Sequence, residues 1–220
     1  MATTQILFIR HGETAWNRIK RIQGHIDIPL ADTGVAQARR LAARLARETR
    51  DGVRIDAIYS SDLMRAQQTA QPAADALGLP LVLREGLRER AYGVFQGHDS
   101  TEIEARFPDA YAVWQTRDPG FEPDGGESQR AFYHRVLHAL EPIVAAHPGG
   151  RIACVAHGGV LDCVYRFANG IDLDAPRSYQ LLNTSINVVD YADGRAHVVQ
   201  WADVSHLSEA SDDDGYSRVL

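Results

Sequence analysis

Two stretches of this sequence each place a histidine directly after a run of apolar residues. In ILFIRHGETAWN (6–17) the apolar run meets Arg10 and His11, and in RIACVAHGG (151–159) it meets His157. An arginine fork binds two oxygens of an oxyanion, and an imidazole near neutral pH can act as a nucleophile, an acid or a hydrogen-bond donor. Together these residue types favour chemistry on an oxyanion.

Glycines follow both histidines. Gly12 lets the backbone turn sharply past a ligand and brings its N–H within reach, and Gly158 and Gly159 can do the same on the other stretch. If the two apolar runs are neighbouring parallel strands, their carboxyl ends lie together at one edge of the sheet. We then expect His11 to face His157 across a few ångströms.

Strand and helix patterns alternate through most of the chain. One helical pattern begins at Thr33, which is expected as its N-cap. A second ends at Gly78, and a bend is expected in it near Pro72. Asp193-Gly194 suits a tight hairpin, which makes the last two strands antiparallel. The expected strands are 4–9, 55–60, 80–85 and 151–157, and the expected helices are 33–50, 61–78 and 127–148.

This alternation predicts an α/β fold with a mostly parallel central sheet, helices on both faces and an antiparallel strand near the C-terminus. The irregular stretch 87–127 is expected to form an insertion over the carboxyl ends of the strands, where such sheets bind ligands. We expect one domain over 1–205 and an acidic, flexible tail over 206–220.

Composition narrows the classes of partner. A formal net charge of −6 over 220 residues disfavours a sequence-independent nucleic-acid binder. No segment approaches the roughly 20 apolar residues of a membrane span, and MATTQILF lacks the features of a signal peptide. We therefore expect a cytoplasmic protein without nucleic-acid or membrane partners. Cys154 and Cys163 are too few for a thiol metal cluster, and His134 and His138 lack an HExxH glutamate, so no metal is expected.

The order and content of six motifs resemble the histidine phosphatase superfamily, also called the phosphoglycerate mutase-like family. The resemblance covers most of the chain and implies the α/β fold of that family and a covalent phosphohistidine on the first histidine. The motifs are RHGETAWN (10–17), RIQGHIDIPLADTGVAQA (21–38), YSSDLMRAQQTA (59–70), LRERAYGVFQG (87–97), PDGGES (123–128) and VAHGGVL (155–161).

Carried over by position, the resemblance implies a role for each matching residue. His11 would be the nucleophile and Glu89 the general acid and base, while Arg10, Arg65 and a protonated His157 would hold the phosphoryl oxygens without a metal. His11 must then be neutral, with one ring N–H donating to a backbone carbonyl, which we expect to be that of Gly12. Substrate contacts are expected from Asn17, Gln23, Gly24, Arg90, Tyr92 and Gly158.

The motifs bear on the choice between phosphatase and mutase. Glu89-Arg90-Ala91-Tyr92-Gly93 resembles the mutases, but Ser100 stands near the place of a mutase lysine. The mutases also have two arginines directly after a tryptophan, whereas Trp114 is followed here by Gln115-Thr116-Arg117. Gln23 before Gly24 and the short PDGGES segment resemble the phosphatase branch. We predict a phosphomonoester phosphatase that needs no cofactor. The alternatives are a 2,3-bisphosphoglycerate-dependent phosphoglycerate mutase and a catalytically quiet phosphate-binding scaffold or sensor, which the presence of both His11 and Glu89 disfavours.

The expected substrate is a small phosphorylated metabolite, with inorganic phosphate as product. Tyr92, Phe95 and Trp114 favour an apolar or aromatic leaving group, and His25 and His98 lie in loops that can border the pocket. The sequence is also compatible with a homodimer.

Overall fold

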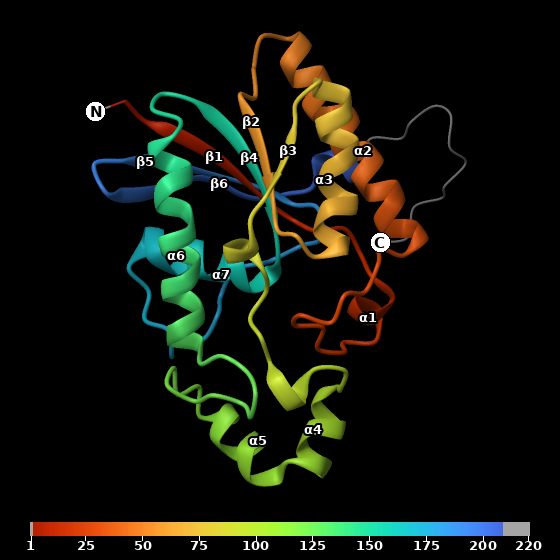
Figure 1. Cartoon of the computed structure of the whole chain (residues 1–220), viewed down its shortest axis with the longest axis vertical. Coiled ribbons are helices and arrows are strands. Elements are labelled where there is room, and N and C mark those ends of the chain that lie inside the picture. Colours follow the sequence, from red (N-terminus) through yellow and green to blue (C-terminus); the bar gives the residue numbers. More distant parts are fainter. Residues whose placement is uncertain (1, 209–220) are drawn as a thin grey trace.

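A six-stranded sheet forms the centre of the molecule in this computed structural model, which describes residues 2–208 (Figure 1). The strand order is β3-β2-β4-β1-β5-β6. The four strands from β3 to β1 are parallel, whereas β5 is antiparallel to β1 and β6 to β5. The strands are β1 Thr4–Arg10, β2 Ala57–Ser60, β3 Leu81–Leu83, β4 Arg151–Ala156, β5 Ile186–Ala192 and β6 Arg195–Asp203.

Helices cover both faces of this sheet, as predicted. Successive side chains of a strand point to opposite faces, so Ile6 and Phe8 of β1 pack toward α6 and α7, while Leu7 and Ile9 pack toward α2 and α3. Figure 1 shows the two helical layers on either side of the strands. The helices are α1 Ala15–Arg18, α2 Asp32–Arg50, α3 Met64–Leu77, α4 Ser100–Arg106, α5 Pro108–Gln115, α6 Gln129–Ala145, α7 Gly158–Asn169 and α8 Ser205–Ser208. None of the helices within residues 2–208 is both long and apolar enough to cross a membrane.

The stretch 87–127, expected as irregular, contains the short helices α4 and α5. They form the end of the molecule opposite the N-terminus in Figure 1. The ring of Phe95 is fully buried there, between 5.4 and 6.2 Å from the rings of Phe107, Trp114 and Phe121. The insertion therefore has an aromatic core of its own, separate from the two layers that sandwich the sheet.

The turns at Gly78 and Asp193-Gly194 are as predicted, but the helix cap at Thr33 is not. Gly78 ends α3 at φ +64°, and Asp193 and Gly194 adopt φ values of +53° and +73° in the β5–β6 turn, as expected. Thr33 does not cap α2, which begins at Asp32. Thr33 therefore lies inside the first turn, and its hydroxyl donates to the carboxylate of Glu13 at 2.7 Å.

The chain end differs in part from the predicted tail. Residues 206–208 complete α8, and the side chain of His206 is buried. The rest of the predicted tail, 209–220, lies outside the described residues.

Candidate active site

His11 and His157 lie side by side at the carboxyl ends of β1 and β4. The two strands are in parallel register, with Arg10 opposite Ala156, and the His11 N–H donates to the Ala156 carbonyl at 2.9 Å. The imidazole centroids are 5.3 Å apart, and the two residues are 3% and 0% exposed. The expected proximity of the two histidines is confirmed.

Three hydrogen bonds fix the position of His11. Its Nδ1–H donates to the Gly12 carbonyl at 2.7 Å, as predicted, so Nε2 keeps its lone pair. The Gly12 N–H donates to the Thr69 hydroxyl at 2.9 Å, and Asn183 Nδ2 donates to the His11 carbonyl at 2.8 Å. Burial, together with the charges of Arg65 and Arg10, lowers the pKa of His11 well below its usual value. The ring is therefore neutral at neutral pH.

The surroundings of His157 favour its neutral form, whereas the resemblance implies a protonated ring against bound phosphoryl oxygens. Burial lowers its pKa well below the usual value, and the charge of Arg65 lowers it further. Its Nε2 lies 2.8 Å from the Ser61 hydroxyl oxygen, which itself accepts from the Leu63 N–H. We assign the Ser61 hydroxyl as the donor to Nε2, which places the ring's own proton on Nδ1. Among the described residues this buried Nδ1 has no partner, so it can donate to a ligand.

The guanidiniums of the half-buried Arg10 and the buried Arg65 hold unused donors. Arg65 is 1% exposed and donates to the carbonyls of Gly24 and Ile26 at 2.8 and 3.1 Å, and Arg10 donates to the carbonyl of Leu181. Burial lowers the pKa of Arg65 to about 10 and also lowers that of Arg10, but both stay charged at neutral pH. Within residues 2–208 neither Nε atom has a hydrogen-bond partner. Buried donors of this kind call for an anionic ligand.

A cavity of about 160 Å³ lies between these groups, and we call it the smaller cavity. It brings together eight of the predicted site residues, and its volume suits a phosphoryl group. Of the other three, Arg90 and Gly158 line a neighbouring cavity, and His157 lies beside His11. The residues that line the smaller cavity are Arg10, His11, Asn17, Arg21, Ile22, Gln23, Gly24, Arg65, Glu89 and Tyr92.

Glu89 stands at the border between the two cavities. Its Oε1 accepts from the Arg90 N–H at 2.8 Å, and its Oε2 accepts from the Gly159 N–H at 3.0 Å. His25, expected near the pocket, contacts this segment through its Nε2, 2.8 Å from the Glu89 carbonyl. His98 lines neither cavity and packs edge-on against Phe107.

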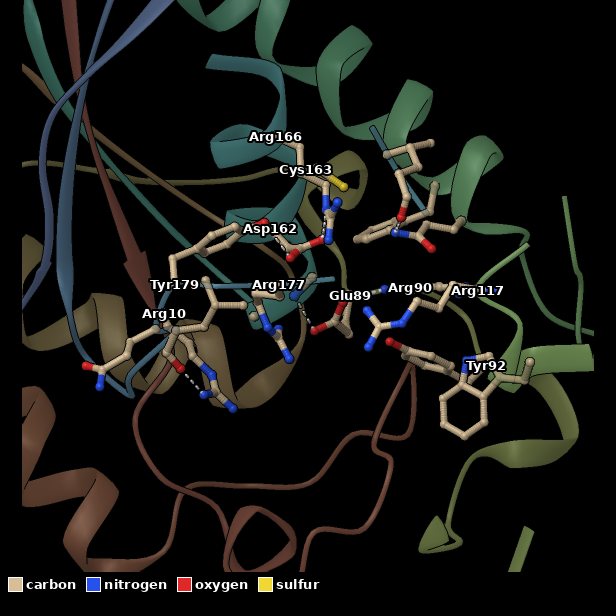
Figure 2. A pocket seen from close by; sticks show the side chains of 18 of the residues that line it. Arg10, Glu89, Arg90, Tyr92, Arg117, Asp162, Cys163, Arg166, Arg177 and Tyr179 are labelled. Carbon is tan, nitrogen blue, oxygen red and sulfur yellow. Dashed lines mark hydrogen bonds and ion pairs between the residues drawn. The ribbon is translucent and has the colours of Figure 1, made fainter. Parts of the chain in front are cut away.

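The larger cavity has a volume of about 680 Å³ and shares Arg10, Glu89 and Tyr92 with the smaller one. Figure 2 shows Arg90 and Arg177 on either side of Glu89, and Arg166 beside Asp162. The expected aromatic lining is only partly present, because Phe95 is buried in the insertion while Tyr92 and Trp114 do line the wall. The charged lining residues are Arg10, Arg90, Arg117, Arg166, Arg177, Glu89, Asp118 and Asp162.

The cations of the larger cavity differ in how they are paired. Arg166 donates to Asp162 at 2.8 Å, and this ion pair is internally neutral. The guanidinium of Arg90 donates to the carbonyls of Glu127 and Phe121, which carry no net charge. The side chains of Arg117 and Arg177 form neither a hydrogen bond nor an ion pair with any residue that the structure describes. The cavity is therefore positively charged, although the whole chain is acidic.

Several residues that support the site were not predicted. Ser61 orients His157, Thr69 binds the Gly12 N–H, and Asn183 binds the His11 carbonyl. Thr69 could have been found, because it follows Arg65 by one helical turn and so shares its face. Ser61 directly follows β2, the neighbour of β4, whereas Asn183 carries no local signal.

Comparison with known proteins identifies the family of the chain. The family model described as histidine phosphatase superfamily (branch 1) matches residues 6–204. Over 208 residues the chain is 41% identical to phosphoglycerate mutase-like protein 4 of Arabidopsis thaliana, covering 93% of this chain and 87% of that protein. It is 40% identical to the metal-independent phosphoserine phosphatase of the same organism over 207 residues, 93% of this chain and 84% of the relative.

A solved structure is also similar. A phosphoserine phosphatase mutant from Entamoeba histolytica, in complex with phosphoserine, superimposes with a TM-score of 0.81 at 27% identity, covering 93% of this chain and 99% of that one. The family model covers most of the chain, and the fold is similar over nearly its whole length. The chain therefore belongs to branch 1 of the histidine phosphatase superfamily and has the phosphoglycerate mutase-like fold.

Proposed function

We propose that this phosphatase hydrolyses a small phosphomonoester through a covalent phosphohistidine on His11, with Glu89 as general acid and then general base. One observation carries the proposal. A neutral His11, its Nδ1–H held by the Gly12 carbonyl, lines a small cavity with Arg10 and Arg65, whose buried Nε atoms have no hydrogen-bond partner within residues 2–208. A nucleophile with a free lone pair and a cationic oxyanion site is what in-line phosphoryl transfer requires.

In the first step His11 Nε2 attacks phosphorus and forms the N–P bond. The P–O bond to the leaving group breaks, and the leaving oxygen takes a proton from Glu89. Arg10, Arg65 and the Nδ1–H of His157 stabilise the equatorial oxygens. The imidazole gains positive charge as the bond forms, and the hydrogen bond to the Gly12 carbonyl stabilises that charge.

In the second step a water molecule replaces the leaving group. The Glu89 carboxylate takes a proton from this water, whose oxygen attacks phosphorus as the N–P bond breaks. Inorganic phosphate and neutral His11 are the products, and Glu89 is again protonated for the next cycle. The place of Glu89 at the border of the two cavities supports both of its roles, because the leaving oxygen and the water occupy the same side of phosphorus.

The charge of the larger cavity supports a substrate class. Arg117 and Arg177 border it without ion-pair partners in the described chain, and they favour a leaving group that carries its own anionic group, such as a carboxylate. This replaces the sequence-based expectation of an apolar leaving group. Phosphoserine, bound in the Entamoeba histolytica structure, is a compound of this class.

The function is tested by following phosphate release and isomer exchange together. Phosphoserine, 3-phosphoglycerate and uncharged alkyl phosphates are supplied with and without 2,3-bisphosphoglycerate. We expect phosphate release, fastest with the carboxylated esters and independent of bisphosphoglycerate. Rapid formation of 2-phosphoglycerate with little free phosphate would favour the mutase instead, and equal, negligible turnover by wild type and His11→Ala would favour a scaffold.

A further inference from the structure

Arg135 of α6 uses all five of its N–H donors beside the segment that carries Glu89. Nε and Nη2 donate to the two carboxylate oxygens of Glu127, at 2.7 and 2.8 Å. Nη1 donates to the carbonyls of Gly86 and Arg88 at 3.0 and 3.1 Å, and Nη2 donates to that of Glu89 at 3.1 Å. A guanidinium has five N–H donors in a fixed planar fork. Arg135 therefore fixes three backbone carbonyls relative to one another.

Glu127 holds the two residues that follow Glu89 in the chain. Its Oε2 accepts from the Ala91 N–H at 2.9 Å, its own N–H donates to the Ala91 carbonyl at 2.8 Å, and its carbonyl accepts from Arg90 Nε at 2.8 Å. Burial alone raises the pKa of Glu127, but hydrogen bonds from Arg135 and the Ala91 N–H lower it overall. Glu127 is therefore ionised, and the backbone is held both before and after Glu89.

The position of the Glu89 carboxylate depends on groups that lie next to Glu127 and Arg135. Its two hydrogen bonds come from the backbone N–H groups of Arg90 and Gly159. The position of Arg90 follows from its contact with Glu127, and Gly159 lies close to Phe132, whose ring centroid is 5.0 Å from the Arg135 guanidinium. Arg135 itself lines neither cavity. It thus adjoins the groups that hold Glu89 without reaching the substrate.

We propose that Arg135, through its ion pair with Glu127, is a positioning residue that sets the place and angle of the Glu89 carboxyl group against the leaving oxygen. The inference rests on the proposed function of Glu89 as general acid. A merely structural Arg135 would affect all substrates alike. A positioning role affects alkyl esters most, because their oxygen leaves only with a proton, whereas an aryl oxygen of low pKa leaves without one.

The test compares kcat/KM for alkyl and aryl phosphates, because this constant reports the first phosphoryl transfer. Arg135→Lys keeps the charge but loses the five-donor fork, and Glu127→Gln breaks the ion pair from the other side. Arg130→Lys, at an exposed position on α6, is the matched control. We expect Arg135→Lys and Glu127→Gln to lose about 10- to 100-fold on alkyl phosphates, as misplaced catalytic groups do. Aryl phosphates should change little, and the control should resemble wild type on both.

Glu89→Gln separates failure of this inference from failure of the proposed function. If Glu89→Gln loses activity equally on both ester classes, the proposed acid role is wrong. If Glu89→Gln loses activity mainly on alkyl esters but Arg135→Lys and Glu127→Gln do not, only the positioning role is overturned.

The double variant Glu89→Gln/Arg135→Lys should be no worse on alkyl esters than Glu89→Gln, since both changes remove the same function, proton donation by Glu89. Additive losses would contradict the proposal. If Arg135→Lys fails to fold, as monitored by thermal unfolding, Glu127→Gln carries the same comparison.

Discussion

The backbone of Gly159 lies directly against the Glu89 carboxylate. Its N–H donates to Glu89 Oε2 at 3.0 Å, and a β-carbon on Gly159 would come within 2.1 Å of Glu89 Oε1. Glycine is therefore required at this position for close approach, and not for an unusual backbone angle, because Gly159 lies within α7. The second glycine after His157 makes room for the proposed general acid.

Replacing Gly159 by alanine should displace Glu89 and reduce kcat/KM for alkyl phosphates by about 100-fold, the range of a lost general acid. Gly158→Ala is the matched comparison, because a β-carbon there would meet its nearest atom, Arg10 Nε, only at 3.6 Å. Steady-state kinetics of both variants checks the prediction. A loss at position 158 as large as that at 159 would count against it.

Ser61→Ala should weaken both the fold and the activity. The substitution leaves the buried Nε2 of His157 without its hydroxyl partner and destabilises the protein by about 1–3 kcal/mol. It also frees the proton of His157 to move to Nε2, so Nδ1 no longer donates to the phosphoryl group. Urea unfolding and phosphate affinity are the measurements, with Ser100→Ala at an exposed position as control. Unchanged phosphate affinity in Ser61→Ala would rule out this role of the hydroxyl.

The charge of Arg177 should govern which substrate is preferred. Arg177→Glu is expected to lower kcat/KM for phosphoserine by about 10-fold, since an exposed charge-assisted contact is worth a fraction of the roughly 1.5–3 kcal/mol of a buried one. Uncharged alkyl phosphates should be unaffected or improved. Arg195→Ala, exposed on β6, serves as control. Equal losses on charged and uncharged esters would show that Arg177 does not select for the anionic group.

Stability should fall as the solution becomes mildly acidic. The pKa values of His11 and His157 are lowered well below normal, so between about pH 6.5 and 5 the unfolded chain binds protons that the folded chain does not. The free energy of unfolding then decreases by up to about 1.4 kcal/mol per pH unit for each of the two histidines. Urea unfolding across this range checks the slope. His157→Gln should show a shallower slope, and a slope identical to that of wild type would contradict the prediction.

Features that depend on strand topology or on a local turn were predictable from the sequence. The proximity of His11 and His157 followed from two apolar runs that end in histidine, because parallel neighbours share an edge. The resemblance supplied Arg65 and Glu89, which approach the histidines only in the folded chain. Gly78 and Asp193-Gly194 were predictable because their turns depend on one or two residues.

Features set by tertiary surroundings were not predictable. The lowered pKa of His157 follows from its complete burial next to Arg65, which no local pattern indicates. Thr33 lies in the first turn of α2 and not at its cap, and its hydroxyl donates to Glu13, which comes from another segment. Arg117 and Arg177 reach one cavity from two loops whose paths no local pattern specifies. The charge of that cavity was therefore missed.

The central claim, transfer of phosphorus to His11, is tested most directly by trapping the intermediate. Glu89→Gln should still accept phosphate from an aryl ester, whose oxygen needs no proton, but should lack the base that activates water. Mass spectrometry of the alkali-quenched protein should then find one phosphate on the peptide that contains His11, and none in Glu89→Gln/His11→Ala. Turnover of the aryl ester by Glu89→Gln with no phosphate on His11 at any time after mixing would contradict the account.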